Sequence, residues 1–244
     1  MNYLPLQSRA LRLFVCFALF FAITVGQLAC GISGGSIPPG RAAALLGRVI
    51  SSEAPIVPIK NAQLTLIVTP DNGISTEIET RTDANGNFSL PNLPAGVNFS
   101  EVILTLKPQS PDLRVQQIQF RIPAQHTATL IAAVTRVSTD ISQIASVGIT
   151  PTRITVDAGE QIRFTPLFKD ALGKTLDLPL AATLLLTDDV GALKSDGTFV
   201  ANSTGAVNVR VFWYDGLSST ASVNVQTPVG SGNQIPPAPP AETN

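Results

Sequence analysis

The chain has 244 residues, of which 44% are hydrophobic and 14% are charged, and its formal net charge is −1. This length suits one or two domains, and the high apolar fraction excludes a disordered chain. The charge balance argues against nucleic acid as a main partner, because phosphate binding requires clustered lysine and arginine. Cys16 and Cys30 are the only cysteines, so the residues that follow them cannot be held together by a disulfide framework.

Residues 1–29 are predicted to be an export signal. Arg9 and Arg12 precede an apolar run, and a small residue, alanine, stands directly before Cys30. These are the physical marks of such a signal. The segment resembles the bacterial lipoprotein signal, which implies that Cys30 is lipidated and becomes the mature N-terminus, although Gln27 stands where that family prefers leucine. Cleavage by the ordinary signal peptidase and an uncleaved anchor are the alternatives.

Removal of the signal leaves 14 basic and 17 acidic residues, a net charge of −3. A basic patch that holds anionic lipid is therefore not expected, and membrane attachment would depend on acyl chains at Cys30. Residues 30–44 are rich in glycine, serine and proline and are predicted to be a flexible tether.

Residues 45–137 are predicted to form a first β-sandwich. Apolar and polar residues alternate in seven segments, as in strands that are buried on one face. Residues 82–90 contain a tight turn, because Asp83, Asn85 and Gly86 favour turn conformations, and the strands on either side of this turn are expected to pair with each other. Seven short segments at this spacing predict an antiparallel sandwich.

Four pieces of this region resemble the carboxypeptidase regulatory-like domain. They are GRV at 47–49, PIKNAQLTL at 58–66, TDANGNFSL at 82–90 and LPAG at 93–96. That family is a transthyretin-like β-sandwich, and the resemblance covers nearly all of residues 45–137. It implies a non-catalytic module, despite the family's name.

A polar linker at residues 138–144 leads to a second predicted sandwich at residues 145–227. This region resembles the bacterial Ig-like domains of the second group, mainly in the paired turns Asp196-Gly197 and Thr204-Gly205. It departs from them at residues 183–186 (TLLL), where the family usually has a tryptophan. That departure concerns the subgroup more than the Ig-like sandwich.

The predicted fold class is therefore all-β, with two consecutive antiparallel β-sandwich domains of transthyretin-like and Ig-like type. The signal segment precedes them. Residues 228–244, which contain the sequence IPPAPP, are predicted to be a disordered, proline-rich C-terminal tail.

The sequence predicts no catalytic residues, no metal site and no cofactor. A Ser-His-Asp arrangement would need His126, the single histidine, but an exposed histidine in a turn is the favoured interpretation. Residues 83–87 carry oxygens at alternate positions, as at the start of a calcium loop, yet turn formation explains each of them. Asp188, Asp189 and Asp196 are a second acidic group, for which a solvated loop is the stronger interpretation.

Phe212, Trp213 and Tyr214 are the candidate ligand-binding segment. Alternation along the strand directs Trp213 to one face and Phe212 and Tyr214 to the other. If Trp213 faces the core, Phe212 and Tyr214 form an exposed pair about 7 Å apart that could stack on a sugar ring or dock a neighbour. The favoured alternative is that both pack under a loop or against the first domain, because large aromatic side chains are usually mostly buried.

We therefore expect a non-catalytic, exported cell-envelope lipoprotein that acts as a structural, adhesive or surface-display binding module. Its expected partners are the membrane, through the N-terminal lipid, and a cell-surface polysaccharide or another envelope protein. The alternative is a carbohydrate-binding or enzyme-partner protein that uses Phe212 and Tyr214. The expected location is the cell membrane or outer membrane, facing the periplasm or the cell exterior.

Overall fold

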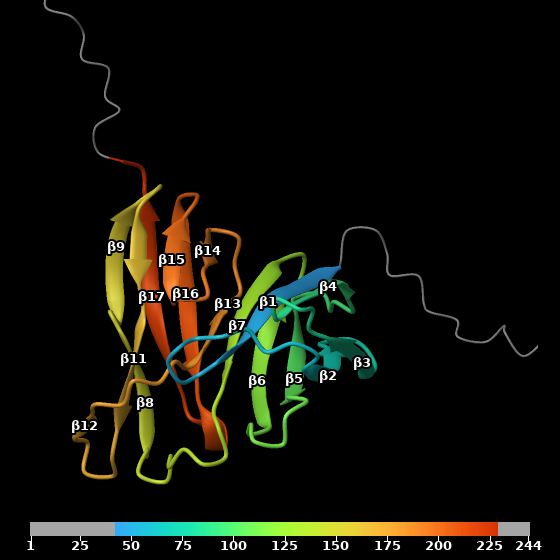
Figure 1. Ribbon diagram of the computed structural model, residues 1–244. Helices are drawn as coiled ribbons and strands as arrows, with labels where there is room; N and C mark the ends of the chain where they lie inside the picture. Colours follow the sequence, from blue (N-terminus) through green and yellow to red (C-terminus); the bar gives the residue numbers. More distant parts are fainter. Residues whose placement is uncertain (1–41, 229–244) are drawn as a thin grey trace, which may run out of the picture. The chain divides into compact units, whose positions relative to one another are not determined.

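The computed structural model describes residues 42–228, which form seventeen strands and one short 3-10 turn, η1 (Tyr214–Gly216) (Figure 1). The predicted all-β class is therefore confirmed for this part of the chain. Cys30, with the predicted signal, nearly all of the tether and nearly all of the tail, lies outside the described residues. No helix in the described part combines the length and the apolar character needed to cross a membrane.

Two sheets build the first sandwich. One contains, in spatial order, β3 (Thr76–Arg81), β2 (Gln63–Pro70), β5 (Phe99–Lys107) and β6 (Gln116–Pro123). It faces β4 (Asn87–Leu93), β1 (Ala43–Ser51) and β7 (Thr127–Val134) across a shared apolar core. The buried residues include the predicted alternating positions of β2, β5, β6 and β7. Strands β1 and β7 run parallel, which requires a long crossover connection, and the chain between them forms strands of both sheets.

The predicted pairing of the strands on either side of the turn at residues 83–87 is wrong. Strand β3 pairs with β2, and β4 pairs with β1, so the turn carries the chain from one sheet to the other. The physical reason is that Ile78 of β3 and Phe88 of β4 both contribute to the first core, and strands in opposite sheets direct such residues toward each other across that core.

The turn itself forms as predicted. Gly86 adopts a positive φ of 75°, and a Cβ atom there would lie 2.5 Å from the backbone oxygen of Val49. The N–H of Gly86 donates to the carbonyl of Asp83 at 3.1 Å. Only glycine meets both the conformational and the steric requirement of this position.

The second sandwich has three groups of strands around another core. One small sheet contains β8 (Ser146–Thr150), β11 (Thr165–Lys169) and β12 (Thr175–Leu176). The other contains β10 (Gln161–Arg163), β15 (Thr198–Ala201) and β14 (Gly191–Leu193). They face β13 (Thr183–Leu186), β16 (Gly205–Phe212), β17 (Ser218–Gln226) and β9 (Arg153–Asp157), of which β9 and β17 run parallel. Phe164, Phe168, Phe199 and Trp213 are the largest fully buried side chains of this core.

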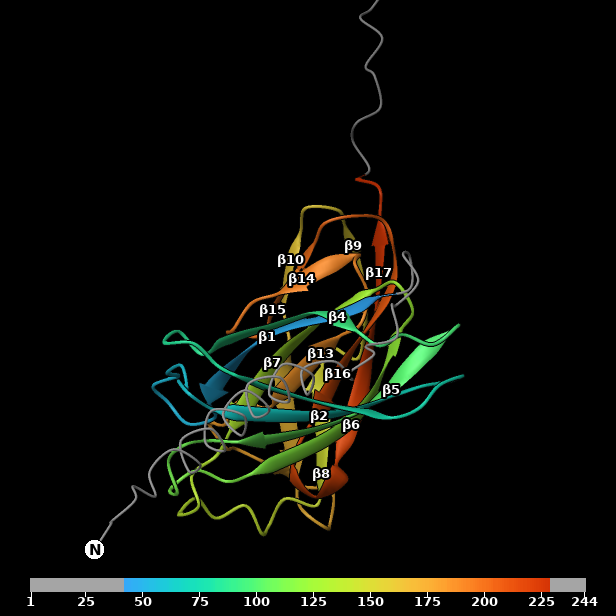
Figure 2. The same cartoon turned by 90° about the vertical axis from the view of Figure 1, so that its right-hand side faces the viewer.

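A single seven-stranded sheet, β4-β1-β7-β13-β16-β17-β9, runs through both sandwiches. The junction is the antiparallel pair β7–β13 (Figure 1). In its register Leu185 lies opposite Leu130. Figure 2 shows that the strand direction rotates from β1 and β4 at one end of this sheet to β17 and β9 at the other, as the natural twist of neighbouring strands requires.

Strand β13 lies between the two cores, which explains its composition. Leu184 and Leu186 belong to the core of the second sandwich, whereas Leu185 belongs to the core of the first. A strand that is buried on both faces needs apolar residues at consecutive positions instead of alternate ones. The run TLLL therefore stands here because two cores meet at this strand.

Candidate functional site

The aromatic segment at residues 212–214 is buried. Trp213 is 2% exposed and faces the second core. Phe212 is 4% exposed and Tyr214 is 8% exposed, so the exposed pair is wrong and the favoured alternative, burial of both rings, is confirmed. The expected common face of the two rings is wrong as well: Tyr214 belongs to the second core with Trp213, because β16 ends at Phe212 and the chain turns into η1. Phe212 joins the first core, where its ring centroid lies 6.5 Å from that of Phe120 in β6. In an isolated second sandwich this side of Phe212 would be open, but here its ring packs against the first core.

Tyr214 connects the two sandwiches through its hydroxyl group. The backbone N–H of Thr135, directly after β7, donates to the Tyr214 hydroxyl at 2.9 Å. Burial raises the pKa of Tyr214, and the hydrogen bond from Thr135 opposes this effect. The ring also contacts Trp213 edge to face, with centroids 5.2 Å apart. Tyr214 therefore stabilises the junction and is not free to stack on a sugar.

Buried hydrogen bonds reinforce the same junction. The N–H of Ala133 in β7 donates to Oγ1 of Thr183 in β13 at 3.0 Å, and this hydroxyl donates to Oε1 of Gln116 at 2.9 Å. On the other side of the junction, Oγ of Ser52 donates to the carbonyl of Ala181 at 2.6 Å. These bonds join side chains and backbone groups that are far apart in the sequence, so they fix the register between the sandwiches.

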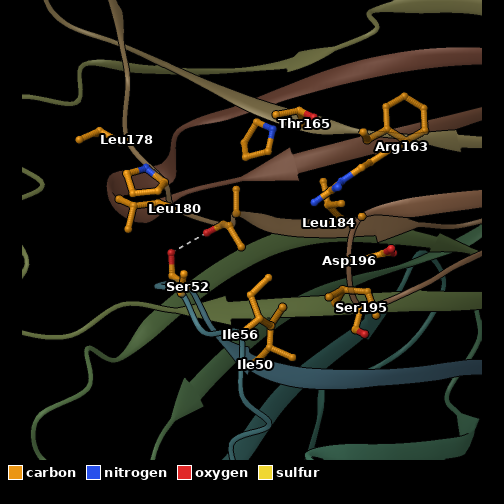
Figure 3. A pocket seen from close by; sticks show the side chains of 18 residues that line it. Ile50, Ser52, Ile56, Arg163, Thr165, Leu178, Leu180, Leu184, Ser195 and Asp196 are labelled. Carbon is orange, nitrogen blue, oxygen red and sulfur yellow. Dashed lines mark hydrogen bonds between the residues drawn. The ribbon is translucent and has the colours of Figure 1, made fainter.

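A cleft of about 240 Å³ opens beside the Ser52–Ala181 contact (Figure 3). Its walls are mainly apolar and come from both sandwiches, including Ile50 and Ile56 on one side and Leu180 on the other. Arg163 and Asp196 are the charged residues at its polar end. The N–H of Thr198 donates to Asp196 at 3.0 Å and lowers the pKa of this carboxyl group. The cleft could hold a small apolar group, with charged side chains at one end.

A second, more polar groove of about 680 Å³ follows β6. One wall contains Gln119, Phe120 and Arg121 of β6, and the other contains Arg210 and Phe212 of β16 with the residues around η1. The Arg210 guanidinium lies over the Phe212 ring, 4.7 Å from its centroid. Sequence analysis missed this groove, because its walls are brought together only by the strand pairing across the junction.

The other acidic positions considered from the sequence have local partners. The backbone N–H groups of Asn85 and Asn87 each donate to Oδ1 of Asp83 at 2.8 Å, and the Asn87 contact is the largest cause of the lowered pKa of Asp83. Asp188 lies 3.8 Å from Nδ1 of His126, which is partly exposed at its turn. No group of three or more His, Cys, Asp or Glu side chains within residues 42–228 is placed to hold a metal ion.

Comparison with known proteins gave matches to solved structures alone. No protein-family model and no curated protein sequence matches it. It is similar to a protocadherin gamma B7 structure of extracellular cadherin domains 1–4, at 13% identity, over 78% of this chain and 50% of that one, with a TM-score of 0.27. It is also similar to the four N-terminal Ig domains of Dscam1 isoform 7.44, at 12% identity, over 79% of this chain and 45% of that one, with a TM-score of 0.18. The chain thus spans about half the length of the structures that it matches.

Proposed function

We propose that the protein is an exported, non-catalytic lipoprotein of the cell envelope that acts as a structural, adhesive or surface-display binding module. The single observation that supports this role best is the seven-stranded sheet through both sandwiches. A pair of domains joined by a mobile linker would hold its end loops at variable distances. A shared sheet keeps them in a fixed arrangement, which suits a spacer or a display module.

The contacts at the junction support a rigid unit. Strands β7 and β13 contribute backbone hydrogen bonds, and the Thr183 hydroxyl and the Tyr214 hydroxyl add buried side-chain contacts. Arg114 also donates to the carbonyl groups of Val137 at 2.9 Å and Thr139 at 3.2 Å in the connection between the sandwiches. The bonds of the Thr183 and Tyr214 hydroxyl groups are buried and would be costly to break, because each would leave a polar group without a partner.

The proposed anchor is the lipid on Cys30. Two or more acyl chains hold a protein firmly at a membrane without a basic patch, which agrees with the mature net charge of −3. In this proposal the module belongs to the cell membrane or outer membrane and faces the periplasm or the cell exterior. Its partner there is a surface polysaccharide or another envelope protein, and nucleic acid is not a partner.

Metabolic labelling with a fatty-acid probe tests the anchor. The wild-type protein should incorporate the probe and remain in the membrane fraction, whereas Cys30→Ala should lose both properties. Cys16→Ala is the matched control, since it removes the other cysteine within the predicted signal and should leave labelling unchanged. Equal labelling of Cys30→Ala and wild type would contradict the lipoprotein assignment.

A further inference from the structure

Strand β6 is an edge strand of its sheet, and the N–H and C=O groups on its outer edge have no strand partner within residues 42–228. The N–H of Ala124 donates to the carbonyl of Asn98 at 2.9 Å, and the register places these two residues directly opposite each other. In an antiparallel pair, hydrogen-bonded positions recur at every second residue. Ile118 and Phe120 therefore bond to β5, whereas the N–H and C=O groups of Gln117, Gln119 and Arg121 point away from it. Within residues 42–228, no other strand pairs with this edge.

The opposite edge of the same sheet differs in charge. Strand β3 presents Glu77, Glu79 and Arg81 at the corresponding outward positions. Charged side chains of this kind protect an edge against pairing with another strand. Along β6 only Arg121 is charged, and Gln117 and Gln119 are neutral. The β6 edge is therefore the less protected of the two.

The groove of about 680 Å³ lies along this unprotected edge. Its far wall is β16 with the residues that lead into β17, so the space is bounded on both sides. A single extended chain needs about 4.8 Å beside its neighbour strand. A second copy of the protein would have to bring a whole sheet into the same space, next to β16 and β17. The turn η1 also lies close to β6 and limits this space further. The groove therefore suits one strand from a partner and not an edge-to-edge dimer.

The charges in the groove indicate the chemistry of the partner. Arg121 contacts Glu101 at 3.5 Å, but Arg210 has no carboxylate within 4.0 Å among the described residues. The Arg210 guanidinium lies over the Phe212 ring, on the same face of the seven-stranded sheet. An ordered guanidinium without a counter-charge is well suited to bind a carboxylate.

We infer that the β6 edge binds an extended peptide segment of a partner protein, which adds a fifth strand to the sheet β3-β2-β5-β6 and places an Asp or Glu side chain against Arg210. Backbone bonds to Gln117, Gln119 and Arg121 would supply the affinity, and the carboxylate would supply the selectivity. This inference rests on the binding role proposed above and names the class of partner. It does not depend on the lipid anchor.

A proline scan of the two edges tests this inference in the purified protein. The probe is a capped octapeptide of alternating glutamate and valine, and its control has lysine in place of glutamate. Gln119→Pro removes an outward N–H from β6, and proline is tolerated at such edge positions. It should weaken binding of the glutamate peptide by about tenfold or more, since several backbone bonds depend on the register at this position. Glu79→Pro is the matched control, because its N–H also points outward but belongs to the β3 edge, and it should bind like wild type.

Two further readouts separate strand addition from other modes of binding. On addition of the glutamate peptide, the amides of Gln117, Gln119 and Arg121 should become protected from hydrogen exchange. Arg210→Gln should lower affinity for the glutamate peptide and reduce its preference over the lysine peptide. Lack of binding by the glutamate peptide, equal binding by Gln119→Pro, or a β6-dependent dimer in sedimentation would each overturn the inference. Loss of fatty-acid labelling alone would bear only on the anchor.

Discussion

Leu185→Ala tests whether the two sandwiches unfold together, as a shared sheet requires, or separately, as two domains in simple contact would. Leu185 is part of β13 in the second half of the chain, but its side chain is 0% exposed within the first core. Truncation of a buried leucine to alanine removes apolar contacts and leaves a cavity, at a cost of about 2–5 kcal/mol. For a domain of this size, such a loss lowers the melting temperature by about 4–20 °C.

The assay follows urea unfolding with one probe in each sandwich. Trp213, the only tryptophan, reports on the second core by fluorescence, and amide exchange in β2 and β5 reports on the first. We expect both midpoints to fall together in Leu185→Ala. Leu186→Ala is the matched control, because Leu186 is equally buried but faces the second core, and it should also shift both probes. An unchanged Trp213 midpoint in Leu185→Ala would refute the reasoning.

Three smaller predictions test single contacts. Tyr214→Phe keeps the ring but leaves the buried N–H of Thr135 without its acceptor, so the free energy of unfolding should fall by about 1–3 kcal/mol in urea titrations; an unchanged value would show that another group replaces the hydroxyl. Gly86→Ala should cost more than about 1 kcal/mol, because its φ is positive and a Cβ would meet Val49, whereas Gly159→Ala, also at positive φ but with open space around it, should cost less. The pKa of Asp83 is lowered in the folded state, chiefly by the hydrogen bond from the N–H of Asn87. The ionised Asp83 carboxylate therefore stabilises the fold at pH values above the ordinary pKa of aspartate, and this stabilisation is lost as the pH falls through the lower pKa of the folded state. Urea midpoints measured below about pH 4 should therefore depend less on pH in Asp83→Asn than in wild type.

Local sequence patterns predicted the strands and most of their buried faces. The alternation at residues 62–68, 102–106 and 118–122 identified core positions correctly, because each strand there is buried on one face only. The turn at Asp83 and Gly86 was also predicted, since its chemistry is local. What these patterns could not indicate is which sheet each strand joins, and the pairing of β3 with β2 and of β4 with β1 shows this limit.

The candidate surfaces depend on contacts between distant residues. Thr183 and Ala133 are fifty positions apart, and nothing in either segment indicates that they pair. Without that pairing, Phe212 would lie on an open face, which is why the sequence left an exposed aromatic pair open as an alternative to the favoured burial of both rings. The run TLLL at residues 183–186 was the one available signal, because four consecutive buried positions indicate a strand that is covered on both faces.

Differential scanning calorimetry of the intact protein tests the central claim most directly. If the two sandwiches share one sheet and unfold together, a single transition should appear, and its calorimetric enthalpy should equal the van't Hoff enthalpy. Two separate transitions, or a calorimetric enthalpy well above the van't Hoff value, would contradict a single cooperative unit.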